Sequence, residues 1–355
     1  MDSMKFSVPF IPDSDYINFL SRRRNQLASV YFSMGHGQAL DARVQPSPWE
    51  QNDLIQGLKR LGDVPAYALL NTRFLHPEHY GDQSRTIMGQ LEELHRERPL
   101  AGMVVTDFYL VQALAQVAHP LAPALELVPG INCMIDSPEK ARAFLGMIRE
   151  SGFKTPSRLI ADRSLNRNLP ALETLVKSLG QDDPDMEIEL LANEGCLAHC
   201  PFKLSHDAQV SFSNTGLCRE QTARLNRELG CRSQFMAHPE QIFTSPFIRP
   251  EDQNHYAAHV TTLKLCGRTL GPRFLERCIR AYQAQRYEGN LLDLLDASHF
   301  MADHFHLDNS ALGKGFLQRI SLCTKQCKPC KVCRDLHSRT IHPKPVQLKR
   351  YKDQL

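Results

Sequence analysis

The stretch Glu189–His206, ELLANEGCLAHCPFKLSH, decides how the rest of the chain is interpreted. Residues 187–195 form an apolar run that ends in Asn-Glu-Gly, and Cys196 and Cys200 follow directly. A short apolar run bounded by glycine is typical of a buried strand. Gly195 lets the backbone turn sharply at its end. We therefore expect a buried strand whose carboxyl end presents two thiols.

Similar runs recur along the chain and alternate with helical patterns. Helices are expected over 49–62, 84–97 and 137–152, the last with Ser137-Pro138-Glu139 as its start. The alternation predicts an α/β fold, a (βα)8 TIM-like barrel. A doubly wound sheet is the alternative, although no G-x-G-x-x-G follows the first run. The eight expected strands are 5–10, 29–34, 66–72, 102–108, 125–133, 157–163, 187–195 and 261–269.

Composition limits the classes of protein that remain. The chain has 355 residues, 42% of them hydrophobic, and a formal net charge of +3. The chain contains no run of about 18 apolar residues, so we expect no membrane-spanning helix. The first residues lack the pattern of a secretory signal. We therefore expect a cytoplasmic protein without a membrane partner, in which thiols stay reduced.

The 11 cysteines are clustered, as metal or iron–sulfur ligands would be. Cys196 and Cys200 are expected at the barrel mouth, in a connection from 196 to 260 that is long enough to suggest function. Cys218 and Cys231 are the nearest candidates to complete a set of four. The alternative for these two is that they are ordinary buried cysteines, as is expected for Cys133 and Cys266.

A different composition begins at Arg319. Residues 319–355 hold ten Lys or Arg and two acidic residues, and we expect them to form a cysteine-rich basic tail appended to a barrel of residues 1–318. Four thiols with spacing x3, x2 and x2 suit one compact iron–sulfur cluster better than two separated zinc knuckles, and zinc remains the alternative. The first three also match the spacing of radical S-adenosylmethionine enzymes, but they lie beyond the last strand. The four are Cys323, Cys327, Cys330 and Cys333.

Polar residues fall at the ends of several expected strands, where a barrel places its chemistry. Lys264 on the last strand should be paired, because a lone buried ammonium is costly, and Glu194 is the expected partner. Arg268 follows that strand. Such groups could bind an anionic substrate, act as acid and base, or only form ion pairs. The other strand-end residues are Asn71, Asp107, Asn132, Asp162, Arg163 and Asn193.

Several segments, in order, resemble the collagenase-like peptidase family U-32 over about residues 100–290. The most specific is Lys264-Leu265-Cys266-Gly267-Arg268 before a helix that ends in AYQAQRY. The others are SRLIADRSLNRNLPALETL, EIELLANEGCLAHC, SNTGLC and FTSPFIRPEDQNHY. The resemblance implies a modified barrel with a 4Fe-4S cluster on four cysteines, used for oxygen-independent hydroxylation of RNA bases or a quinone precursor.

The resemblance matches Cys196 and Cys218 to family ligands, whereas Cys200 and Cys231 have less clear counterparts. Asn193-Glu194-Gly195 replaces the family's histidine–glycine–alanine. We therefore expect an iron–sulfur redox or hydroxylating enzyme that acts on a small molecule, a peptide or RNA, with Glu194, Lys264 and Arg268 shaping its catalytic site and an electron donor as a possible partner. The alternatives are a metal-dependent peptidase, although H-E-x-x-H and G-x-S-x-G are absent, and a non-catalytic cluster-carrying subunit of a heterodimer.

Overall fold

Eight parallel strands with helices around them form a nearly closed barrel, as the alternation of apolar runs predicts. The computed structural model describes residues 4–34, 40–43, 49–81, 83–215, 221–321 and 323–345. Each expected strand is present; seven are shorter than expected, whereas β2 begins two residues earlier than expected, at Leu27. The strands are β1 (Lys5–Pro9), β2 (Leu27–Ser33), β3 (Ala66–Leu70), β4 (Gly102–Val105), β5 (Glu126–Pro129), β6 (Arg158–Ala161), β7 (Glu187–Leu191) and β8 (Thr262–Lys264).

The hydrogen-bonded order is β5-β4-β3-β2-β1-β8-β7-β6, so the ring has one seam, between β5 and β6. Three backbone hydrogen bonds cross this seam: Leu127 N–H to Lys154 O, Lys154 N–H to Leu125 O, and Asp162 N–H to Ile135 O. The buried Glu126 carboxylate adds an ion pair with Lys154 at 3.1 Å. The seam therefore closes the barrel with fewer bonds than a continuous ladder would.

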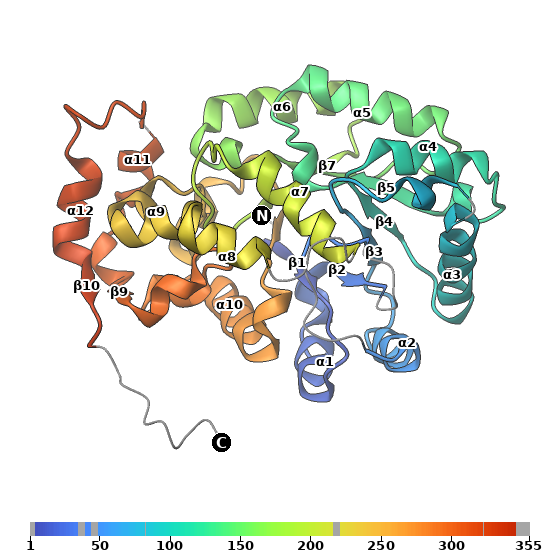
Figure 1. The fold of residues 1–355 in the computed structure, drawn as a ribbon, viewed down its shortest axis with the longest axis horizontal. Coiled ribbons are helices and arrows are strands. Elements are labelled where there is room, and N and C mark those ends of the chain that lie inside the picture. Colours follow the sequence, from blue (N-terminus) through green and yellow to red (C-terminus); the bar gives the residue numbers. More distant parts are fainter. Residues whose placement is uncertain are drawn as a thin grey trace.

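Helices follow most strands and cover the outside of the barrel (Figure 1). Side-chain caps fix where several of them begin: the Asp13 carboxylate accepts from Tyr16 N–H, and the Ser137 hydroxyl accepts from Lys140 N–H. The covering helices are α1 (Ser14–Ser21), α2 (Gln51–Arg60), α3 (Gln83–Glu97), α4 (Phe108–Gln116), α5 (Pro138–Glu150), α6 (Leu169–Asp182) and α10 (Pro272–Ala284).

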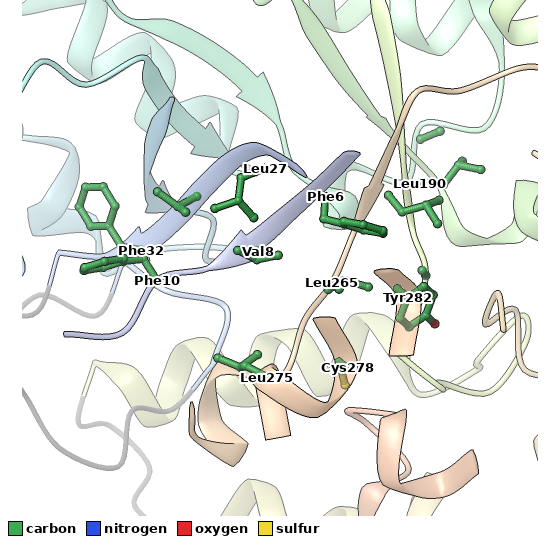
Figure 2. Packing of buried hydrophobic residues seen from close by; sticks show 14 of the residues in the cluster. Phe6, Val8, Phe10, Leu27, Phe32, Leu190, Leu265, Leu275, Cys278 and Tyr282 are labelled. Atoms are coloured by element: carbon green, nitrogen blue, oxygen red, sulfur yellow. The ribbon is translucent and has the colours of Figure 1, made fainter. Parts of the chain in front are cut away.

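The main core lies between the outer face of the strands and these helices. Figure 2 shows Phe6 and Val8 of β1 on the side that faces Leu275 and Tyr282 of α10. The rings of Phe6 and Tyr282 meet edge to face, with centroids 6.4 Å apart. A smaller apolar cluster fills the inside of the barrel, and its members are Tyr31, Tyr67, Leu69, Val104, Val128 and Ile160.

The described part of the long connection between β7 and β8 contains three α-helices and two 3-10 helices (Figure 1). The first four are α7 (Lys203–Asn214), α8 (Gln221–Glu228), α9 (Cys231–Ala237) and η6 (Pro239–Thr244), and each contacts the next. The last is η7 (Pro250–His255). Every helix in the described part of the chain is too short or too polar to cross a bilayer.

The segment after β8 and α10 ends in a two-stranded unit and the tail. Strand β9 (Phe305–Leu307) pairs antiparallel with β10 (Ile341–Pro343), and α11 (Phe316–Ser321) and α12 (Val332–Thr340) lie between them in sequence. Leu336 of α12 is buried in the same apolar cluster as the barrel helices. The division at residue 319 into a barrel and a separate tail remains a prediction about which part folds alone.

Replacing Leu336 with Ala should lower the free energy of unfolding by about 2–5 kcal/mol, because the change leaves a cavity in a closed core. Chemical denaturation measures it. Leu229, which is 71% exposed, provides the matched control, and Leu229→Ala should change stability by less than about 0.5 kcal/mol. Equal effects of the two changes would show that α12 is not part of the core.

Candidate functional site

A cavity of about 80 Å³ lies at the carboxyl ends of the strands. The three residues expected to shape a catalytic site, Glu194, Lys264 and Arg268, all line it, and so does Cys196. Other lining residues come from the ends of β3, β4 and β6 and from the connections that follow β2, β5 and β7. The barrel mouth therefore brings together residues that are far apart in the sequence.

Two glycines set the directions in which the chain leaves β7 and β8. Gly195 has φ +76° and Gly267 has φ +121°, both in the region that favours glycine. A Cβ at Gly195 would overlap the Ser298 side chain, and one at Gly267 would overlap the Phe274 ring. The turn expected at Gly195 is thus present, and a second turn places Arg268 beside the same cavity.

The Asn193 amide connects the ends of these two strands. Its Oδ1 accepts from Cys266 N–H at 2.7 Å, and its Nδ2 donates to the carbonyls of Cys266 and Leu294, each at 3.0 Å. The Asn193 carbonyl also accepts from Asp296 N–H at 2.9 Å. Asn193 is fully buried, so these bonds form away from water and fix the segment around Asp296 against the barrel mouth.

Charged side chains of both signs surround the cavity. Glu194 lies 2.6 Å from Arg163 and 3.8 Å from Arg43, and Arg43 also pairs with Asp296 at 3.0 Å. Arg268 pairs with Asp41. These carboxylates hold the guanidinium groups in place, so the arginines are arranged before any ligand arrives.

A second group of polar residues lies on the side of α7. Lys203 donates to Asn132 Oδ1 at 2.9 Å and pairs with Asp207, and Arg73 lies 3.3 Å from the same carboxylate. Burial lowers the pKa of Lys203, and the nearby Arg163 lowers it further, against the opposing charge of Asp207. His206 faces this group, and burial likewise lowers its pKa.

The buried Lys264 is paired, as expected, but its partner is Glu189 and not Glu194. Lys264 Nζ lies 3.3 Å from Glu189 Oε1 and 3.7 Å from the centroid of the Tyr31 ring. Glu189 points into the barrel from the middle of β7, where it also accepts from the Ser7 hydroxyl at 2.6 Å and lies 3.6 Å from Arg158. Glu194, beyond the strand, turns to the arginines at the mouth.

The pKa of Glu189 is set by two opposing effects. Burial raises it, but Lys264, Arg158 and the Ser7 hydrogen bond together hold it below the ordinary value. Glu189 is therefore ionised at neutral pH and compensates two buried cations. Glu189 can act as this counter-charge because its side chain lies inside the barrel. The strand pattern in the sequence did not predict that role.

The four cysteines expected to hold the first cluster are divided in the structure. Cys196 lines the cavity, Cys200 lines a neighbouring hollow with Arg163 and Lys203, and Cys218 lies outside the described residues. Burial and then Glu194 raise the pKa of Cys196, while Arg163, Arg43 and Lys203 act to lower it. Burial also raises the pKa of Cys200 and Cys231, and the neighbouring Cys200 adds to the effect on Cys231.

Cys266, expected to be a packing residue, also lines the cavity. Burial raises its pKa, and Asp296 and Glu194 raise it further. The strand period was a signal for this position that the sequence interpretation did not use. Side chains two residues apart share a face of a strand, so Cys266 is expected on the same inner face as Lys264. Cys133, by contrast, is buried and donates weakly to Val105 O, as a packing cysteine would.

The tail cysteines lie at a second, separate hollow, a groove of about 770 Å³ between η6 and α12. All four of them line it, and Cys333 is the least exposed. Over the part of the chain that the structure describes, no three His, Cys, Asp or Glu side chains are arranged to hold a single metal ion.

Comparison with known proteins finds relatives among curated sequences and solved structures. No family model matches the chain. The protein named Uncharacterized protease MJ1657, from Methanocaldococcus jannaschii, is 30% identical over 184 residues, which are 52% of this chain and 53% of that protein. The chain thus spans about half the length of this relative. The U32 peptidase Mk0906 matches with a TM-score of 0.43 and 17% identity, over 61% of this chain and 79% of that one.

Glu189→Gln should lower the free energy of unfolding by about 3–5 kcal/mol at pH 7, because it leaves Lys264 and Arg158 buried without their counter-charge. The folded pKa of Glu189 is depressed, so this stabilisation is present above the unfolded pKa of about 4.3 and is lost as the pH falls through the lower folded value. Denaturation at a series of pH values should show the difference from wild type shrinking below about pH 4.

Two controls accompany this experiment. Adding Lys264→Met to Glu189→Gln should restore part of the lost stability, since the unpaired ammonium is then gone. Glu228→Gln removes an exposed ion pair with Arg224 and should cost less than about 1 kcal/mol. A Glu189→Gln effect as small and as independent of pH as that of Glu228→Gln would contradict the ion cluster.

Proposed function

We propose, from the resemblance of its sequence segments to the U-32 peptidase family, that this chain is an iron–sulfur-dependent redox enzyme with its reaction site at the barrel mouth. The observation that carries the proposal is that one small cavity is lined by a thiol, Cys196, and by the polar residues Glu194, Lys264 and Arg268. Thiolates at such a rim suit a soft metal cluster, and the cations beside them suit an anion.

The donor set contains cations that would suit a cluster. Arg163, Arg43 and Lys203 act to lower the pKa of Cys196 against the larger effects of burial and Glu194, and they would offset the negative charge that cysteine ligands bring. The charge of Cys200 acts on Cys231, and Cys218 is the fourth candidate. When bound, a 4Fe-4S cluster would supply one-electron transfer, for which a separate electron donor is needed.

The size and charge of the cavity restrict the part of a substrate that enters it. The cavity of about 80 Å³ is small and lined by Arg43, Lys264 and Arg268, which suits a carboxylate or a phosphate group of the substrate. The Nε of Arg268 is buried and has no hydrogen-bond partner among the described residues. We propose that Arg268 donates to an anionic group of the substrate, with Lys264 adding positive charge from below.

Glu194 would then act on the substrate from the opposite side of the cavity. It is held by Arg163 and Arg43, so its carboxylate has a fixed position, and its backbone carbonyl accepts from Ala297 N–H at 2.6 Å. A carboxylate fixed in this way can accept a proton or orient a bound water. The remainder of a larger substrate, whether a small molecule, a peptide or RNA, would lie outside the mouth against the connection between β7 and β8.

The second candidate is a peptidase, which the name of the curated relative favours. In such an enzyme a bound metal ion would activate water for attack on a peptide carbonyl. Anaerobically prepared protein, with and without added zinc, can be incubated with a mixed peptide library and assayed for new amino termini. Hydrolysis that is abolished by Glu194→Gln and that needs no iron would favour the peptidase over the redox enzyme.

The redox proposal predicts that protein purified without oxygen is brown and bleaches in air. Cys196→Ala combined with Cys200→Ala should remove one cluster, about four iron and four sulfide ions per chain. Iron and sulfide analysis and the visible spectrum measure this loss. Cys133→Ala, at a buried cysteine outside both groups, is the control and should keep its full iron content. Unchanged iron in the double variant would exclude these two cysteines as ligands.

A further inference from the structure

The groove between η6 and α12 is separate from the barrel mouth and has its own set of thiols. In Figure 1, α11 and α12 lie at one end of the molecule, and α3 and α4 at the other. Cys323, Cys327, Cys330 and Cys333 all line the groove. Phe243 of η6 and Val332 of α12 form part of an apolar wall beside them.

The four cysteines come from one short stretch of the chain and share one hollow. They lie within residues 323–333, and all four line the groove. Metal ions bind cysteine as the thiolate, and a bound metal offsets the charge of its ligands. A metal centre in this groove would therefore take its ligands from a single short loop.

The loop that carries these thiols has little else to hold it. Residues 323–331 are exposed, and their side chains make no hydrogen bond or ion pair within the described structure. Both neighbouring helices, however, are anchored in the core, α11 through Ile320 and α12 through Leu336. An exposed loop with fixed ends and four thiols in one groove is what a metal centre would order.

We propose that Cys323, Cys327, Cys330 and Cys333 hold a multi-iron cluster of the 4Fe-4S type, independent of any cluster at the barrel mouth. Structural zinc sites usually take two Cys-x2-Cys pairs separated by a longer spacer, whereas a compact iron–sulfur cluster can take its cysteines from one run such as this. The groove of about 770 Å³ has room for such a cluster. Lys325 and Arg334 line the same groove and would offset the charge of the ligands.

The test uses the full chain, reconstituted without oxygen from ferrous iron and sulfide, with a parallel sample given zinc alone. Cys327→Ser combined with Cys330→Ser should lose about four iron and four sulfide ions relative to wild type. The mouth variant, Cys196→Ala with Cys200→Ala, should keep the tail cluster, so that loss of one site is distinguished from loss of the other. Lys328→Ala, in the same loop, should keep full metal content.

Two results would overturn the proposal. One is that the tail variant loses a single zinc ion per chain and no sulfide, which would make the site mononuclear. The other is unchanged iron, sulfide and zinc, which would show that these cysteines are not ligands. If the double variant is insoluble, Cys330→Ser alone in the mouth-variant background should alter the electron paramagnetic resonance signal of the reduced protein, and an unaltered signal would equally contradict the proposal.

Discussion

The arrangement of the barrel mouth depends on the buried amide of Asn193. Its hydrogen bonds to Cys266 and Leu294 connect the end of β7 to the end of β8 and to the segment before Asp296. An amide can donate and accept at once, whereas an apolar side chain of the same size would leave these backbone groups unpaired in the core. The backbone positions of Glu194, Cys196 and Asp296 follow from this junction, and ion pairs then fix the directions of the charged side chains.

The strands could be predicted from the sequence because each is an apolar run with a turn residue at its end, as in 187–195. The thiols and cations that end these strands were predicted for the same reason. The predicted partner of Lys264, Glu194, was wrong because the pairing of these side chains depends on the register of β7 and β8. In that register Thr262 lies opposite Glu189, and Lys264 lies opposite Leu191. The sequence contains no signal for that alignment. Asp41, Arg43 and Asp296 were missed because they come from connections, where no periodicity shows which way a side chain points.

The connection between β7 and β8 joins the two thiol-bearing regions physically. It leaves the mouth at Cys196, passes through α7, α8 and α9 in contact, and reaches the groove at η6, which packs on α12. Its length, unusual for a barrel, thus has a structural explanation: it spans the distance from the barrel to the tail.

The seam between β5 and β6 gives the barrel two strand edges that a continuous ring would lack. Few backbone bonds cross it, and the Glu126 carboxylate is buried there beside Lys154 and the Tyr67 hydroxyl. Local opening of the native state needs the least energy where the fewest bonds must break. Amide protons along this seam will therefore exchange with solvent before those of β1 and β8. The first water to enter the barrel will reach Glu126. Local opening of the barrel thus occurs on the side away from its strongest strand pairs.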